Sequence, residues 1–126
     1  MGKRKTPEQI ADEQRRYALA SGAHTPEEFE LLLSDPNQAI RAVAAANPDA
    51  DDEVLARFAR DRFWGARIEV ASHPNASRRT LLSMLESDPR KRGVVHHAAR
   101  ERLESDGVVF DEAGLPLLPP THGERG

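Results

Sequence analysis

The sequence predicts an all-α protein, a solenoid of about three to four two-helix repeats of 26 residues, followed by a short C-terminal extension or hairpin. The first observation is that Pro48 and Pro74 are separated by one such period, with Gly22 one period earlier. The second is that polar residues recur at the same period, to within one position: Thr25, Asp51 and Ser77; Arg15, Arg41 and Arg67; Asp35, Asp61 and Asp88. Such a period is typical of solenoids, in which each unit buries its apolar side only against its neighbours.

The first helix of each repeat is expected to begin at an aspartate, and the predicted N-caps are Asp35, Asp61 and Asp88. An aspartate carboxylate at this position accepts hydrogen bonds from the free N–H groups of the first turn. Pro36 strengthens the prediction, because proline has no N–H to leave unpaired at the first helical position. This helix is expected to end at Asn47, since asparagine tolerates the left-handed conformation and Pro48 cannot continue a helix.

The second helix of each repeat is expected to begin at Thr25, Asp51 or Ser77. Thr25-Pro26-Glu27-Glu28 has the pattern of a capping box with proline at the first helical position. These helices carry the large apolar residues, whereas the first helices are rich in alanine. The expected core residues of the second helices are Phe29, Leu32, Leu33, Val54, Leu55, Phe58, Leu81, Leu82 and Leu85.

The chain is expected to divide into a mobile basic N-terminus (1–6), the solenoid (7–106), a C-terminal cap or hairpin (107–118) and a mobile tail (119–126). The last helix is predicted from about Pro89 to Glu104. Its exposed apolar side needs a cover, and the residues expected to fold back on it are Val108, Val109, Phe110, Leu115, Leu117 and Leu118. The alternative is that this segment pairs with the same segment of a second chain and forms a homodimer.

Two segments of the chain, Ile40–Asp61 and Arg67–Leu85, resemble variant leucine-rich repeats, a HEAT-like family. The shared features are a hydrophobic-Arg start, an Ala-x-Asn/His-Pro-Asn centre and a leucine-rich second half, and the resemblance covers about residues 15–103. The resemblance implies helices stacked as a right-handed superhelix, and it says almost nothing about function. The family's iron–sulfur cluster on a cysteine-rich segment is not expected here, because the sequence contains no cysteine.

Composition excludes several classes of function. The chain has 126 residues, no cysteine and a formal net charge of −3, so we expect no disulfide, no thiolate metal site and no cofactor. The absence of cysteine fits a cytoplasmic location, and neither a signal peptide nor a membrane span is expected. No Gly-x-Ser-x-Gly or phosphate-binding loop is present, and the five histidines lack the spacing of a metal site. We therefore expect a protein that is not an enzyme.

Arginines are the remaining candidates for a binding surface. Residues 55–102 contain 11 Lys/Arg and 5 Asp/Glu, whereas both flanking segments are acidic. Arg15, Arg41 and Arg67 should form a ladder on one face, either bound to the aspartates at the helix starts or contacting a ligand. A second basic cluster is expected at one edge of the stack: Arg57, Arg60, Arg62, Arg78, Arg79, Arg90, Lys91 and Arg92. We expect a protein–protein interaction module, with a nucleic-acid-binding solenoid that uses residues 55–102 as the alternative.

Overall fold

The computed structural model describes residues 4–118, and this part of the chain is all-α apart from one small hairpin. The elements are α1 (Pro7–Gly22), α2 (Pro26–Leu33), α3 (Gln38–Ala46), α4 (Asp52–Phe58), α5 (Trp64–Ala71), α6 (Arg78–Ser83), a 3₁₀ turn (Pro89–Lys91), α7 (Val94–Ser105), β1 (Val109–Phe110) and β2 (Pro116–Leu117). The predicted mobile tail (119–126) and the first three residues of the predicted mobile N-terminus lie outside the described residues. Of the helices between residues 4 and 118, none combines the length and the apolar character that crossing a bilayer requires.

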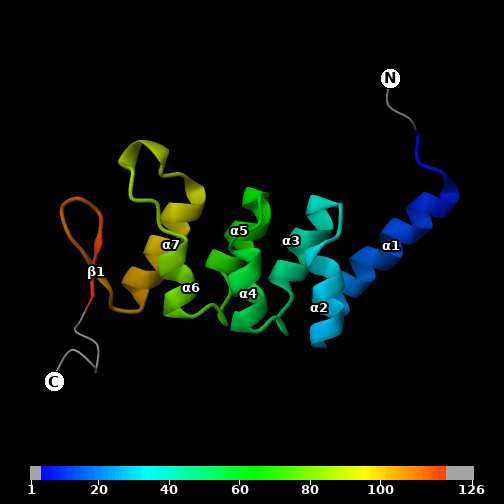
Figure 1. The fold of residues 1–126 in the computed structure, drawn as a ribbon, viewed down its shortest axis with the longest axis horizontal. Helices are drawn as coiled ribbons and strands as arrows, with labels where there is room; N and C mark the ends of the chain where they lie inside the picture. The colour runs from blue at the N-terminus through cyan, green and yellow to red at the C-terminus, as the bar shows by residue number, and fades with distance from the viewer. Residues whose placement is uncertain (1–3, 119–126) are drawn as a thin grey trace.

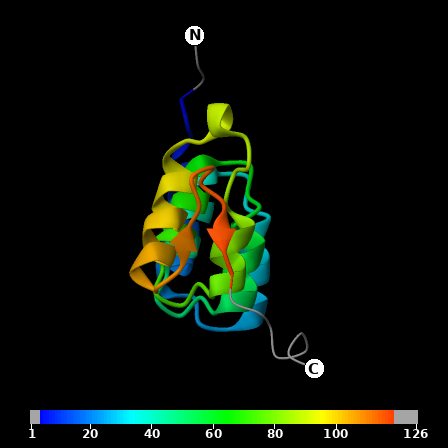
Figure 2. The same ribbon diagram turned by 90° about the vertical axis from the view of Figure 1, so that its left-hand side faces the viewer.

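The helices lie in two rows that follow the chain along the long axis of the molecule (Figure 1). In one row α1 contacts α3, α3 contacts α5, and α5 contacts α7. In the other row α2 contacts α4 and α4 contacts α6. Seen along the long axis, the two rows form two columns, with the hairpin in front of one end (Figure 2). Helices that are one sequence period apart are therefore neighbours in space.

Small side chains are concentrated in one of the two rows, as the sequence predicts. The row of α1, α3, α5 and α7 buries Ile40, Val70 and Leu103 together with many alanines: Ala20, Ala44, Ala45, Ala66, Ala71 and Ala99. The row of α2, α4 and α6 buries Phe29, Leu32, Leu55, Phe58 and Leu81. Small residues allow the axes of α3 and α5 to approach closely, while the larger side chains fill the space between the rows.

The predicted starts of the second helices are confirmed. Thr25, Asp51 and Ser77 are the N-caps of α2, α4 and α6, and each side chain accepts a hydrogen bond from the N–H three residues ahead. Thr25 and Glu28 form the predicted capping box. A second capping box, which the sequence analysis missed, starts α1 with Thr6 and Gln9. Its signal is plain in the sequence, since a proline follows each threonine and a Glu or Gln lies three residues on.

The predicted N-caps of α3 and α5 are wrong. Asn37 caps α3, and the N-cap position of α5 is Phe63, which makes no side-chain cap. Instead, Asp35 and Asp61 each accept the N–H two residues ahead, at 2.9 and 2.8 Å. Both carboxylates also bind arginines of the preceding unit, and this tertiary contact holds them short of the helix start.

Asn47 follows the last residue of α3 as predicted, but the expected left-handed conformation is wrong. Its φ is −61° and its ψ is 126°, and no residue other than glycine has a positive φ within residues 4–118. The extended ψ is the conformation that Pro48 imposes on the residue before it. A left-handed asparagine is therefore not what ends this helix.

The continuous helix predicted from Pro89 to Glu104 is wrong. Asp88 caps only a 3₁₀ turn, Pro89–Lys91, and α7 begins after Gly93, whose backbone is extended (φ −125°, ψ −159°). The Arg92 side chain donates to the carbonyl oxygens of Glu86 and Ser87, at 2.7 and 3.3 Å. These bonds turn the chain back toward the preceding loop and separate the turn from the helix.

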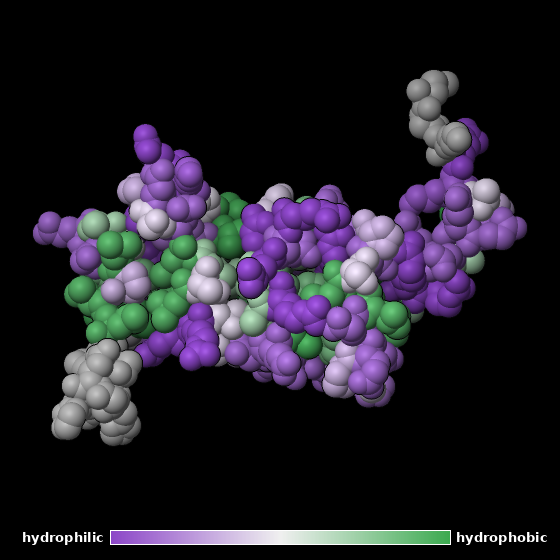
Figure 3. All heavy atoms as spheres, viewed as in Figure 1, coloured by the Kyte–Doolittle hydropathy of each residue, from purple (hydrophilic) through white to green (hydrophobic). Residues whose placement is uncertain are grey.

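The C-terminal segment forms the predicted hairpin, in which Val109 pairs with Leu117 and Phe110 with Pro116. Only part of its apolar surface covers α7. Val108 is buried, and the Phe110 ring lies half-buried with the guanidinium carbon of Arg100 4.6 Å from its centre. The predicted burial is wrong for the remaining apolar residues, which stay exposed: Val109, Leu115, Leu117 and Leu118. Figure 3 shows hydrophobic side chains gathered at this end of the molecule.

Candidate functional site: an arginine-lined depression

A series of arginines runs along the end of the stack where α2 joins α3 and α4 joins α5, which we call the arginine edge. Arg41, Arg67 and Arg92 each donate to the backbone carbonyl six residues earlier, at 2.8, 2.6 and 2.7 Å. The first member of the series is Arg16, which binds Asp35 at 2.6 Å. Arg15 does not belong to this series, because its exposed side chain pairs with Asp12 of the same helix.

The Arg41–Asp61 ion pair is the buried part of this edge. Arg41 Nε lies 2.8 Å from Asp61 Oδ2, and the two side chains are 5% and 7% exposed. Burial alone would raise the pKa of Asp61, but hydrogen bonds from Arg41 and from the Phe63 N–H outweigh it and lower the pKa. Arg41 also donates to the Asp35 carbonyl, so its guanidinium is used between neighbouring units and is closed to a ligand from solvent.

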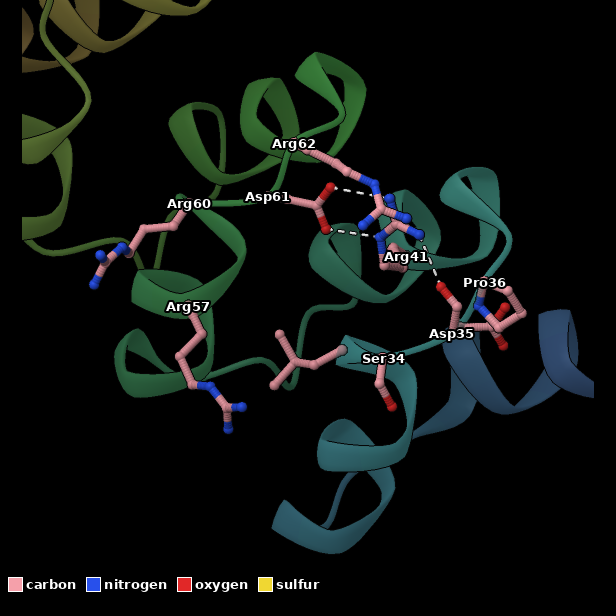
Figure 4. Close-up of a pocket in the computed structure, with 9 residues that line it drawn as sticks. Ser34, Asp35, Pro36, Arg41, Arg57, Arg60, Asp61 and Arg62 are labelled. Atoms are coloured by element: carbon pink, nitrogen blue, oxygen red, sulfur yellow. Dashed lines mark hydrogen bonds and ion pairs between the residues drawn. The ribbon is translucent and has the colours of Figure 1, made fainter.

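Beside this ion pair is a depression of about 590 Å³ (Figure 4). It is lined by Leu33, Ser34, Asp35, Pro36, Arg41, Arg57, Arg60, Asp61 and Arg62. Four arginines against two aspartates make its lining basic. Arg57 and Arg60 extend away from the ion pair in Figure 4, so the exposed arginines do not converge on one point.

Two of these arginines have no partner within residues 4–118. Neither Arg60 nor Arg62, both exposed, makes a side-chain hydrogen bond or ion pair in this part of the chain. Arg57 pairs with Glu30, and both side chains are more than half exposed. An exposed pair of this kind contributes little to stability, so Arg57 can exchange Glu30 for another carboxylate at low cost.

The rest of the predicted basic cluster lies elsewhere. Arg78 donates to the Asp106 carbonyl at 3.1 Å, and Arg90 pairs with Asp88 at 3.2 Å. Arg79 is exposed on α6, outside the residues that line the depression. Arg67 and Lys91 line a different cavity, between α5 and α7. The structure thus brings the predicted Arg41, Arg57, Arg60 and Arg62 together, but it separates the other predicted residues from them.

The opposite end of the stack, which we call the turn edge, binds neighbouring units through backbone carbonyls. Asn47 Nδ2 donates to the carbonyls of Ala20 and Ala23, at 2.9 and 2.8 Å. His73 accepts a backbone N–H at Nδ1, so its Nε2 donates to the Asn47 carbonyl at 2.8 Å. Arg102 donates to the His73 carbonyl at 2.6 Å. Sequence reasoning placed Asn47 and His73 in turns but did not identify these contacts between units.

No metal site is apparent, because no three His, Asp or Glu side chains lie close enough to share an ion between residues 4 and 118. Comparison with known proteins found no family model, no curated protein and no solved structure that matches the chain. The resemblance to variant leucine-rich repeats therefore rests on the repeat residues alone.

Proposed function

We propose that this protein is a non-catalytic, cytoplasmic α-solenoid module that binds an acidic segment of another protein in its arginine-lined depression. Support for the solenoid comes from the two rows of helices within residues 4–118, in which each helix packs mainly against helices of its own and the neighbouring units. The right-handed superhelix and the variant leucine-rich repeat type are part of the same proposal. The observation that carries the function is the depression itself, in which Arg60 and Arg62 have no carboxylate partner within residues 4–118.

The chemistry of the depression favours an extended acidic chain over a small anion. The exposed guanidinium groups of Arg57 and Arg60 do not converge, so one phosphate could not contact them all. An extended peptide with several carboxylates can bind each arginine separately, and the planar guanidinium suits a two-point bond to a carboxylate. Arg41 and Asp61 neutralise each other in a buried ion pair, so neither side chain is available to the peptide.

Binding of a nucleic acid is the competing function, and the structure offers it less support. The basic residues of segment 55–102 are distributed over the depression, α6, the 3₁₀ turn and α7, and several already bind carbonyls or carboxylates. A nucleic-acid surface needs many cations in contact with successive phosphates, and its affinity falls steeply with salt.

The test is a titration of the full chain with two fluorescent probes, an Asp/Glu-rich peptide and a random-sequence DNA duplex, read by fluorescence anisotropy. We expect the peptide to bind and the double variant Arg60→Glu/Arg62→Glu to lose at least about tenfold in affinity, as expected when charge-assisted hydrogen bonds are removed. Arg79→Glu is the matched control, since it reverses an exposed arginine of the same segment outside the depression. Binding of DNA but not peptide, or equal losses in both variants, would contradict the proposal.

A further inference from the structure

At two junctions between units, an arginine of the arginine edge pairs with a carboxylate. At the next junction, which we call the open junction, the arginine has no such partner within residues 4–118. Arg16 binds Asp35 and Arg41 binds Asp61, in each case an aspartate just before the next helix of the same row. The corresponding residue for Arg67 is Glu86, whose carboxylate accepts the N–H two residues ahead as Asp35 and Asp61 do. Yet no carboxylate of residues 4–118 lies within ion-pair distance of Arg67. Its guanidinium instead donates a hydrogen bond to the backbone carbonyl of Asp61.

A cavity of about 300 Å³ lies at this open junction, between α5 and α7. It is lined by Trp64, Arg67, Met84, Glu86, Lys91, Gly93, Val94, Val95 and His96. Two of its apolar side chains face solvent, since Trp64 is 55% and Val94 61% exposed. The cavity therefore combines two cations with an open apolar wall.

The first turn of α7 adds backbone donors to the same cavity. Gly93 is the N-cap of this helix and has no side chain to accept a hydrogen bond. The N–H groups of Val94, Val95 and His96 find no acceptor within residues 4–118. The free N–H groups of a first turn and the positive end of the helix dipole attract anions.

His96 contributes another donor without an acceptor. Burial lowers the pKa of His96, so the ring is neutral at pH 7, and its Nδ1 accepts the Glu86 N–H at 2.9 Å. Nε2 therefore carries the proton, and it is the one buried side-chain nitrogen or oxygen within residues 4–118 that has no hydrogen-bond partner. A buried donor without an acceptor is costly, and His96 is among the residues that line this cavity.

We propose that this cavity binds the C-terminal carboxylate of a partner peptide whose last side chain is apolar. The carboxylate takes the place at Arg67 that Asp61 takes at Arg41, beside Lys91 and the first turn of α7, while the apolar side chain lies against Trp64 and Val94. Glu86 disfavours a phosphate, because a doubly charged anion would be repelled more strongly than a carboxylate. The inference rests on the proposed function and gives the partner a second point of contact, one repeat along the arginine edge.

Trp64 provides the measurement, because it is the single tryptophan of the chain. The probe is a short N-acetylated peptide that ends in leucine with a free carboxylate, and the control is the same peptide with a C-terminal amide. We expect the free acid to change the tryptophan emission saturably and the amide to bind at least about tenfold more weakly. Equal affinities of the two peptides would overturn the proposal. Tryptophan emission that neither peptide changes would also overturn it, because Glu86 would then pair with Arg67 and occupy the site.

Gly93→Asp tests the site without removing any of its donors. The backbone at this position suits any residue, and a Cβ would meet nothing within 4 Å. The new carboxylate would cap α7 and occupy the site from within, so we expect a higher melting temperature and loss of peptide binding, whereas Gly93→Ala should still bind. A Gly93→Asp variant that binds like the unmodified protein would refute the inference.

The two proposals can fail separately. Arg67→Gln should weaken the leucine peptide about tenfold and leave the Asp/Glu-rich peptide, prepared with an amidated end, nearly unaffected. Arg60→Glu/Arg62→Glu should do the reverse. If the leucine peptide binds equally to both variants, the carboxylate site is wrong whatever the depression binds.

Discussion

The two ends of the helical stack join the same units by different chemistry. At the turn edge, Asn47, His73 and Arg102 each donate to backbone carbonyls of the preceding unit. At the arginine edge, Arg16 and Arg41 bind side-chain carboxylates of the following unit. A backbone carbonyl is present whatever the sequence, so three different residue types serve at the turn edge. At the arginine edge, the neighbouring unit must supply a carboxylate in the right position. The ion pair can therefore be missing where Glu86 takes the place of aspartate.

The largest effect should come from breaking the buried pair of the arginine edge. Arg41→Met should reduce the free energy of unfolding by about 3–5 kcal/mol, because Asp61 would remain buried without its partner. Urea denaturation measures the change. Arg15→Met is the control, because it removes an exposed arginine and should shift the stability by less than about 0.5 kcal/mol. A loss below about 1 kcal/mol for Arg41→Met would mean that water reaches Asp61.

The turn edge should respond less. Asn47→Ala should cost about 2–3 kcal/mol, since the carbonyls of Ala20 and Ala23 lose a buried donor. Asn75 offers a matched comparison, because its Nδ2 also donates to two carbonyls but the residue is exposed. We expect Asn75→Ala to cost less than about 1 kcal/mol, since water can replace its side chain. Equal losses in denaturation would show that burial does not distinguish the two asparagines.

Acid should weaken the buried ion pair of the arginine edge. Although burial opposes ionisation, hydrogen bonds from Arg41 and the Phe63 N–H lower the pKa of Asp61. A carboxylate with a lowered pKa in the folded state contributes stability that is complete above its unfolded pKa, about 3.9, and is lost as the pH falls through the folded value. Stability measured from pH 6 to pH 2.5 should therefore fall less steeply in Asp61→Asn than in the unmodified protein. Parallel curves would contradict this role of Asp61.

The smallest effect is expected at the open junction. Arg67 is half-buried and makes one recorded hydrogen bond, to the Asp61 carbonyl, so Arg67→Met should cost about 1 kcal/mol or less. The same denaturation experiment compares it directly with Arg41→Met. A loss as large as that of Arg41→Met would show that Glu86 pairs with Arg67 in solution and that the third junction is closed as well.

Short-range features of this fold could be predicted from the sequence. The N-caps at Thr25, Asp51 and Ser77 bond to the N–H three residues ahead, and the hairpin depends on apolar segments around a turn. The division into an alanine-rich row and a row of larger side chains follows from the period of the repeat. In each case the contact lies within one unit or repeats in every unit, so the pattern of residues carries the information.

The candidate sites depended on contacts between units, which the sequence predicted only in part. Arg57 and Arg60 were identified from the sequence. The choice between Arg15 and Arg16 was not, because neighbouring residues of a helix point about 100° apart and only packing shows that Arg16 faces Asp35. The role of Asp61 as an ion-pair partner instead of a helix cap was likewise decided by Arg41, which lies in the preceding unit. Local hydrogen bonds depend on a few adjacent residues, whereas the partner of a charged side chain depends on how whole units stack against one another.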